Sequence, residues 1–286
     1  MEIIIGKTAG FCFGVLRAVN ETDKLLNNKK NVCCLGELVH NRQVIEELEN
    51  KGLEIVKDIN KSGEVTIIRA HGEPLETYKK AEKLRINLYD LTCPKVLKIH
   101  NIATEYANNG YYIFLIGHKE HPETIGTISY CGKNSDIIQN SNEIDEKLHK
   151  FYNSHINNLL ILVQTTYSLE KFNEIVSVIK ENLRNNSNIN IEVKNTICNA
   201  TKLRQEETKQ IACQVDIMII IGGKNSSNTN KLYQISKKYC KESILIETEK
   251  ELNIDYIKKF NKVGLMAGAS TPQKSIDLVV EKLEQI

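Results

Sequence analysis

Three of the eight cysteines in this chain of 286 residues precede a glycine at one fixed distance. The pairs are Cys12 and Gly36, Cys93 and Gly117, and Cys198 and Gly222, and in each pair the residue numbers differ by 24. Each glycine follows a short apolar run and is itself followed by a polar cluster. A chain that repeats the same features in the same order is expected to fold as a set of related units. The sequence therefore predicts one unit present three times, each offering one thiol.

Short apolar runs alternate with longer charged segments along the sequence. The expected strands are Glu2–Ile5, Val32–Leu35, Val65–Ile68, Ile86–Leu91, Tyr112–Ile116, Leu159–Val163, Ile189–Val193, Ile217–Ile221, Ile244–Ile246 and Val263–Met266. Apolar residues at three- and four-residue spacing indicate helices at Asn41–Lys51, Leu75–Leu84, Lys95–Asn108, Leu169–Leu183, Lys202–Cys213, Lys231–Tyr239 and Lys274–Ile286. This alternation predicts an α/β fold of three related units with small, mostly parallel sheets. The predicted units are residues 1–93, 94–194 and 195–286.

Composition and charge exclude several classes of protein. A hydrophobic fraction of 41% and a charged fraction of 26% are ordinary for a globular protein. The net charge of +2 and the absence of Trp argue against a nucleic-acid partner or a membrane surface. No apolar run approaches the roughly 18 residues of a membrane span, and the N-terminus lacks the pattern of a signal peptide. We therefore expect a cytoplasmic protein, in which the cysteines are not disulfides.

The repeated cysteines Cys12, Cys93 and Cys198 each precede an expected helix. The positive end of a helix favours the thiolate, which is the form that binds iron or zinc. Taken singly, each could be a buried packing residue, but the repeated spacing favours a shared centre. Three thiolates would hold a four-iron cluster by three corners and leave one iron open. The other thiols are expected to pack in the interior or lie in exposed loops: Cys33, Cys34, Cys131, Cys213 and Cys240.

Polar side chains gather where the expected strands end, which is the ligand-binding edge of a parallel sheet. His40, His71 and His121 share this position and can bind an anion or transfer a proton. Ser226, Ser227 and Asn228 follow a strand and open a helix, and Ser270 repeats the arrangement. Such groups can bind a diphosphate, although ordinary helix capping explains any one of them alone. The remaining histidines are expected to have no special role: His100, His118, His149 and His155.

Glu123 is the candidate general acid, because it lies two residues after His121 at one of these strand ends. A carboxyl group beside an anionic substrate has a raised pKa and can deliver a proton. Glu37 and Glu73 are rival candidates. Thr165 and Thr166 add hydroxyl groups that can relay a proton or orient a substrate alcohol.

Nine motifs, in this order, resemble those of the LytB/IspH family of 4-hydroxy-3-methylbut-2-enyl diphosphate reductases: GFCFGV, GELVHN, RAHGEP, LTCP, GHKEHPE, VQTT, NTICNAT, NSSNT and GASTP. The resemblance covers essentially the whole chain. It implies a trefoil of three α/β units around one 4Fe–4S cluster per chain, with Cys12, Cys93 and Cys198 as its ligands. It also implies that Glu123, with Thr165, donates protons. The implied substrate contacts are His40, His71, His121, Thr165, Ser226, Ser227, Asn228 and Ser270.

The implied reaction is the reductive dehydroxylation of (E)-4-hydroxy-3-methylbut-2-enyl diphosphate to isopentenyl and dimethylallyl diphosphates. This is the last step of the non-mevalonate isoprenoid pathway, and the open iron would bind the substrate hydroxyl. We expect a monomer that takes electrons from a donor such as ferredoxin or flavodoxin and lacks the RNA-binding-like extension of some relatives. The alternatives are another iron–sulfur dehydratase and a non-catalytic iron–sulfur redox protein. The first would bind a carboxylate or thioester, and the second would use four thiolate ligands.

Overall fold

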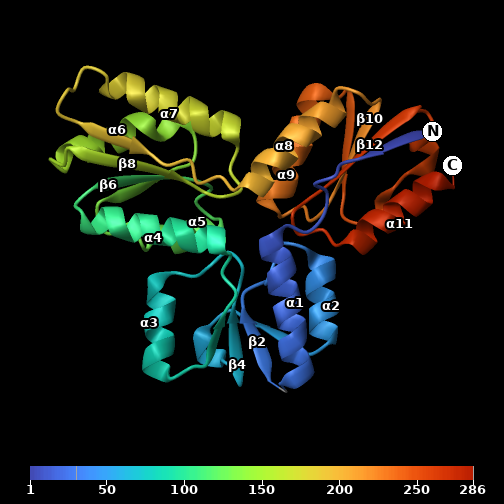
Figure 1. Cartoon of the computed structure of the whole chain (residues 1–286), viewed down its shortest axis with the longest axis horizontal. Coiled ribbons are helices and arrows are strands. Elements are labelled where there is room, and N and C mark those ends of the chain that lie inside the picture. Colours follow the sequence, from blue (N-terminus) through green and yellow to red (C-terminus); the bar gives the residue numbers. More distant parts are fainter. Residues whose placement is uncertain (30, 286) are drawn as a thin grey trace. The chain divides into compact units, whose positions relative to one another are not determined.

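The structure is a computed structural model that describes residues 1–29 and 31–285 (Figure 1). Ile286, the last residue of the expected C-terminal helix, lies outside the described residues, as does Lys30. The chain forms two compact units. The first comprises Met1–Asn28, Glu37–Leu53 and Asn199–Ile286, and the second comprises Lys29–Gly36 and Glu54–Cys198.

The first unit contains one parallel four-stranded sheet. Its strands, in spatial order, are β1 (Glu2–Ile5), β12 (Lys262–Ala267), β10 (Ile217–Ile221) and β11 (Glu242–Ile246). Its helices are α1 (Phe13–Asn28), α2 (Arg42–Asn50), α8 (Asn199–Ala212), α9 (Ser227–Tyr239), α10 (Ile254–Ile257) and α11 (Gln273–Glu284). A short 3-10 helix, η3, spans Glu249–Glu251.

The sequence IMIII of β10 explains how this sheet is covered on both faces. Ile217, Ile219 and Ile221 pack in a core with residues of α10 and α11. Met218 and Ile220 pack on the opposite face with residues of α8 and α9. Figure 1 shows α8 and α9 on one side of β10 and β12 and α11 on the other. Because the strand is buried on both faces, it is apolar at every position.

The second unit contains two four-stranded sheets. One has the order β3 (Leu53–Val56), β2 (Val32–Leu35), β4 (Val65–Ile68) and β5 (Leu88–Asp90). The other has the order β7 (Ser135–Ile138), β6 (Tyr112–Ile116), β8 (Asn158–Val163) and β9 (Asn190–Val193). The helices are α3 (Leu75–Leu84), α4 (Pro94–Asn108), α5 (Pro122–Ile128), α6 (Ile144–Asn153) and α7 (Leu169–Leu183), with 3-10 helices η1 (Ile59–Lys61) and η2 (Ser141–Glu143).

The three sheets share one strand order, which explains the spacing of the cysteines. The central strands β2, β6 and β10 each end immediately before Gly36, Gly117 or Gly222. The edge strands β1, β5 and β9 each end shortly before Cys12, Cys93 or Cys198. Each 24-residue interval is therefore one helix that leads from the edge strand of one sheet to the central strand of another. The prediction of three related α/β units with small parallel sheets is confirmed.

The N-terminal strand β1 pairs with β12 and so completes the sheet formed by the last segment of the chain. This pairing gives β1 the place that β5 and β9 occupy in their own sheets. The predicted boundaries between residues 93 and 94 and between residues 194 and 195 stay a prediction.

Two strands were not expected from the sequence, β3 and β7. Both are edge strands of four residues, and only two positions of β3 and one of β7 are buried. An edge strand buries less apolar surface, so the continuous apolar run that reveals β6 or β10 is missing. Within residues 1–29 and 31–285, no helix combines the length and the apolar character that a membrane span requires.

Candidate active site

Each of the three repeated cysteines is held in the same way. Cys12, Cys93 and Cys198 come directly before α1, α4 and α8. Their backbone N–H groups donate to carbonyl groups two residues beyond the ends of β12, β4 and β8. The acceptors are Ala269 for Cys12 at 3.0 Å, Ala70 for Cys93 at 3.0 Å and Thr165 for Cys198 at 3.1 Å. The threefold repeat of the sequence therefore extends to one hydrogen bond that fixes each thiol at the carboxyl edge of a sheet.

The eight cysteines are all free thiols, and their burial separates them into two groups. Cys12, Cys93 and Cys198 are partly exposed. The other thiols are buried, except for the exposed Cys213, as expected from the sequence: Cys33, Cys34, Cys131 and Cys240. Burial raises the pKa of Cys131 to about 12, so this thiol stays protonated. The three cysteines that precede helices are therefore accessible to a metal centre, and the buried thiols are not.

Glu123 and Thr165 form a paired hydrogen bond in the second unit. Glu123 lies in the first turn of α5, and Thr165 follows β8. The Thr165 N–H donates to Glu123 Oε1 at 2.6 Å, and the Thr165 hydroxyl donates to Oε2 at 2.6 Å. The carboxyl group is 2% exposed, and its desolvation raises the pKa of Glu123 to about 7, although both Thr165 hydrogen bonds act to lower it. Such a group holds a proton near neutral pH and can give it up.

The two rival acids have different surroundings. Glu37 lies 3.8 Å from His40 Nδ1 and is half exposed. Glu73 is buried, and desolvation raises its pKa, but its Oε1 accepts a hydrogen bond from Arg69 Nε at 2.8 Å. The Arg69 cation opposes this rise in the pKa of Glu73, whereas no cation opposes the rise at Glu123, which makes Glu123 the better candidate for a proton donor.

His71 and His121 lie together in the second unit, with their rings edge to face and the centroids 5.4 Å apart. His121 is the N-cap of α5, and its Nδ1 accepts a hydrogen bond from the Glu123 N–H at 3.1 Å. Because Nδ1 accepts, the neutral ring carries its proton on Nε2. His121 thus places Glu123 and can itself donate a hydrogen bond through Nε2.

In the first unit, three loops meet at the backbone carbonyl of His40. The Ser270 hydroxyl donates to this carbonyl at 3.0 Å. A Cβ atom on Gly223 would lie 2.7 Å from the same oxygen, so only glycine lets the loop after β10 approach this closely. The sequence therefore brings the His40, Gly223 and Ser270 loops to one edge of the sheet.

The start of α9 provides the polar groups of the first unit. Ser226 is the N-cap, and its hydroxyl accepts a hydrogen bond from the Thr229 N–H at 3.3 Å, so the capping role considered for it is real. Ser227 is the first residue of α9. Asn228 is 4% exposed, yet neither atom of its side-chain amide has a hydrogen-bond partner within the described residues. A buried amide without partners at a helix N-terminus fits the binding of an anion.

The family to which these residues belong follows from the match of the whole chain. The family model described as "LytB protein" matches residues 3–284. The chain belongs to the LytB family. It is 40% identical, over 290 residues and the full length of both chains, to a 4-hydroxy-3-methylbut-2-enyl diphosphate reductase of Alkaliphilus oremlandii. A protein of the same name from Clostridioides difficile is 40% identical over 289 residues, again over the full length of both chains.

Two solved structures resemble this LytB-family chain. The (E)-1-hydroxy-2-methyl-but-2-enyl-4-diphosphate reductase of Plasmodium falciparum is 30% identical with a TM-score of 0.89, covering 99% of this chain and 87% of that one. A second is titled as (E)-4-hydroxy-3-methyl-but-2-enyl diphosphate reductase, the terminal enzyme of the non-mevalonate pathway. It is 38% identical with a TM-score of 0.71 and covers both chains fully.

Sequence reasoning missed residues of this LytB-family chain that hold the site loops. Gln164 Oε1 accepts from the His118 N–H at 3.0 Å, and Gln164 Nε2 donates to the Thr166 hydroxyl at 2.8 Å. In the first unit, the Glu207 carboxylate accepts from the Lys7 N–H at 2.7 Å and from the Thr8 N–H at 2.8 Å, ahead of Cys12. The glutamine lies within the VQTT motif, so its position was a usable signal. The glutamate lies outside all nine motifs.

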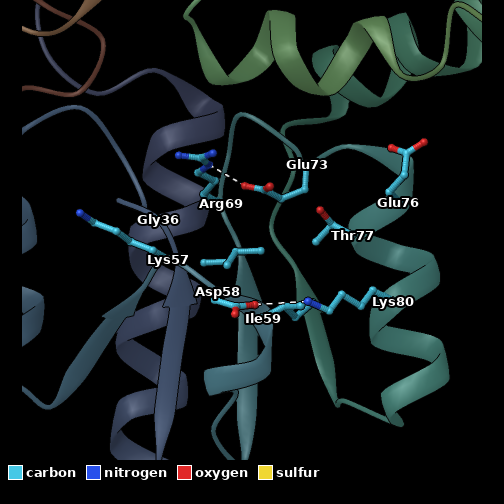
Figure 2. Close-up of a pocket in the computed structure, with 10 residues that line it drawn as sticks. Gly36, Lys57, Asp58, Ile59, Arg69, Glu73, Glu76, Thr77 and Lys80 are labelled. Atoms are coloured by element: carbon cyan, nitrogen blue, oxygen red, sulfur yellow. Dashed lines mark hydrogen bonds and ion pairs between the residues drawn. The ribbon is translucent and has the colours of Figure 1, made fainter.

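A pocket of about 460 Å³ opens at the carboxyl edge of β2, β3 and β4. Figure 2 shows the Arg69–Glu73 ion pair at one end of it and the Asp58–Lys80 pair at the other. Of the sequence-predicted candidates, Glu73, the rival general acid, lines this pocket, whereas the predicted cluster ligands, Glu123 and the substrate-binding residues do not. Four of its charged side chains form these two ion pairs with one another.

Proposed function

We propose that this chain reduces (E)-4-hydroxy-3-methylbut-2-enyl diphosphate to isopentenyl diphosphate and dimethylallyl diphosphate, the last step of the non-mevalonate pathway. The reaction breaks the C–O bond of the allylic alcohol and forms one C–H bond of the product. It consumes two electrons and two protons and releases the hydroxyl group as water. Membership of the LytB family over residues 3–284 and the names of the full-length relatives support this activity.

The observation that carries the proposal is the set of hydrogen bonds made by Thr165. Its N–H and hydroxyl groups both bind the carboxyl group of Glu123, and its carbonyl accepts from the backbone N–H of Cys198. One residue therefore holds the buried acid and a candidate metal ligand. A reduction that must deliver a proton next to an electron source requires this proximity.

Glu123 is the proton donor in this proposal. With its pKa raised to about 7 by burial, it carries a proton below that pH. It gives this proton to the departing hydroxyl group, either directly or through the Thr165 hydroxyl, which lies 2.6 Å away. A charged, buried Glu123 is then left, and the surrounding low dielectric favours its reprotonation for the C–H bond-forming step.

Cys12, Cys93 and Cys198 are the proposed ligands of a 4Fe–4S cluster, one per chain. The LytB family is known for an iron–sulfur cluster, and the three partly exposed, similarly held thiols suit one. Held by these three thiolates, such a cluster would supply electrons and would leave one iron with an open position for the substrate alcohol. The task of the three N–H···O hydrogen bonds is to keep the thiol positions fixed.

The proposed diphosphate-binding residues combine imidazole, hydroxyl and amide donors. Asn228 is the strongest member, because its buried amide is without a partner in the described part of the chain. Hydrogen bonds to a charged group contribute about 1.5–3 kcal/mol each, so a few such donors hold a diphosphate without an arginine clamp. The full set is His40, His71, His121, Thr165, Ser226, Ser227, Asn228 and Ser270.

The electron donor proposed for this enzyme is a small redox protein such as ferredoxin or flavodoxin. We also propose that the chain acts as a monomer, which size-exclusion chromatography with light scattering checks, and that it works in the cytoplasm. Its eight free thiols agree with a reducing compartment.

The test of the function is anaerobic turnover. Protein reconstituted with iron and sulfide is mixed with the hydroxymethylbutenyl diphosphate and dithionite, and the five-carbon diphosphates are separated by chromatography. We expect both isopentenyl and dimethylallyl diphosphates. If cluster-replete protein forms neither product, the proposal is refuted. If the cluster is reduced by dithionite but no substrate is turned over, the redox-protein alternative is favoured.

A further inference from the structure

The turn that carries His71 rests directly on the ring of a buried histidine. Gly72 adopts a φ of +75°, and a Cβ atom added to it would lie 2.9 Å from Cε1 of His100 and 3.2 Å from Cγ2 of Thr92. The ring of His100 therefore lies against the backbone of Gly72, one residue from His71. His100 belongs to α4, the helix that begins directly after Cys93.

The polar atoms of His100 do not explain its presence in the interior. The side chain is 3% exposed, and neither ring nitrogen has a hydrogen-bond partner among the described residues. Burial lowers the pKa of His100 to about 4, so the ring is neutral at physiological pH. Burying a polar ring without hydrogen bonds costs stability that an apolar side chain of similar size would not cost. A role other than stability is needed for it.

A face of the His100 ring contacts Tyr130, just after the C-terminal end of α5. His100 stacks on Tyr130 with the ring centroids 4.1 Å apart and the planes 12° from parallel. Tyr130 follows α5, the helix whose first turn carries Glu123. The neighbouring Ser129 hydroxyl accepts a hydrogen bond from the Leu75 N–H at 2.9 Å, which ties this region to the same turn. The flat ring of His100 is thus a spacer between Gly72 and the end of α5.

We propose that His100 is a positioning residue that sets the place of His71 through contact with Gly72. The inference rests on the proposed function, in which His71 binds the diphosphate. The five-membered ring fits between Gly72 and Tyr130, whereas a six-membered ring extends further and has to displace the turn. Since the packed core around α4 gives way less readily than a turn, the displacement falls on Gly72 and His71.

The decisive substitution is His100→Phe, which removes the unpaired nitrogens and enlarges the ring. We expect the protein to retain its cluster and its thermal stability, while KM for the diphosphate substrate and the inhibition constant of inorganic pyrophosphate both rise about tenfold. Tyr130→Leu, which removes the other support of the ring, is expected to change KM in the same direction. His149→Phe is the matched control, because His149 is exposed on α6 and its loss leaves KM unchanged.

A double-mutant cycle separates positioning from general damage. If His100 acts through His71, then His100→Phe has no further effect on KM or on pyrophosphate inhibition in a His71→Ala background. Effects that multiply in the double variant would overturn the inference, as would wild-type kinetics in both His100→Phe and Tyr130→Leu. Both of these outcomes would overturn the role of His100 while the wild-type protein still turns over its substrate. Absence of turnover in the wild-type protein would instead refute the proposed function.

Discussion

Replacing Glu123 by glutamine removes the transferable proton but preserves the shape and the hydrogen bonds of the site. The glutamine oxygen can accept from the Thr165 N–H as Oε1 does now, and its amide N–H can donate to the Thr165 hydroxyl. We therefore expect the variant to keep its fold and the hydrogen bond from the Cys198 N–H to the Thr165 carbonyl. The transferable proton is lost. We expect kcat to fall by a factor of about 10² to 10⁴, the usual contribution of a positioned general acid.

The same substitution changes the pH dependence of stability. Glu123 has a pKa of about 7 in the folded chain, against the ordinary value of 4.5 for a solvated glutamate in the unfolded chain. The folded state therefore binds more protons than the unfolded state between these values, and its stability falls as the pH rises from 4.5 to 7. The difference corresponds to about 3 kcal/mol above pH 7. Glu123→Gln lacks this loss and should be the more stable protein at pH 8.

The assay compares wild-type and Glu123→Gln proteins, both containing the cluster, by anaerobic kinetics and by urea unfolding at pH 5 and pH 8. The wild-type kcat should decline above pH 7, because the acid loses its proton, and the variant should lack this decline. The free energy of unfolding of the wild type should decrease relative to the variant between the two pH values. A variant with full activity, or with the wild-type pH dependence of stability, would refute the assignment of the buried acid.

Three further substitutions, one of them with a matched control, test single contacts. Thr165→Val removes one of the hydrogen bonds that lower the pKa of Glu123, so the alkaline limb of kcat should move to higher pH while kcat falls about tenfold; an unmoved limb would contradict the pairing. Cys198→Ser should lose iron on gel filtration, whereas Cys131→Ser, at a buried thiol, should retain it; equal iron content would remove Cys198 as a ligand. Asn228→Leu should keep or raise the unfolding free energy, since the amide is unpaired, and raise KM more than tenfold; an unchanged KM would exclude a substrate contact.

The sequence predicted the sheets where strands are buried on both faces. The runs at Tyr112–Ile116 and Ile217–Ile221 were located to the residue, because burial on both faces requires continuous apolar sequence. The edge strands β3 and β7 were not predicted, because they are only partly buried and so lack a continuous apolar run. The pairing of β1 with β12 was also not foreseen, because periodicity carries no information about which distant strand a terminal segment joins.

The site was predictable where a residue type and its place after a strand both indicated chemistry. Glu123 and Thr165 were chosen in this way, and their hydrogen bonds agree with that choice. His100 was expected to have no special role, but it is buried. Its position four residues after Val96 and three before Ala103 places it on the apolar face of α4, which was a usable signal. The Cys N–H···O hydrogen bonds could not be predicted, because they join residues that are far apart in the chain.

The most direct test of the proposed reaction is its electron balance. Reconstituted protein receives a limiting, titrated amount of dithionite with excess alcohol diphosphate, and the five-carbon products are quantified. We predict one molecule of isopentenyl or dimethylallyl diphosphate for every two electrons consumed, with the hydroxyl oxygen released as water. A dehydrated product formed without consumption of electrons, or electrons consumed without a five-carbon product, would contradict the account.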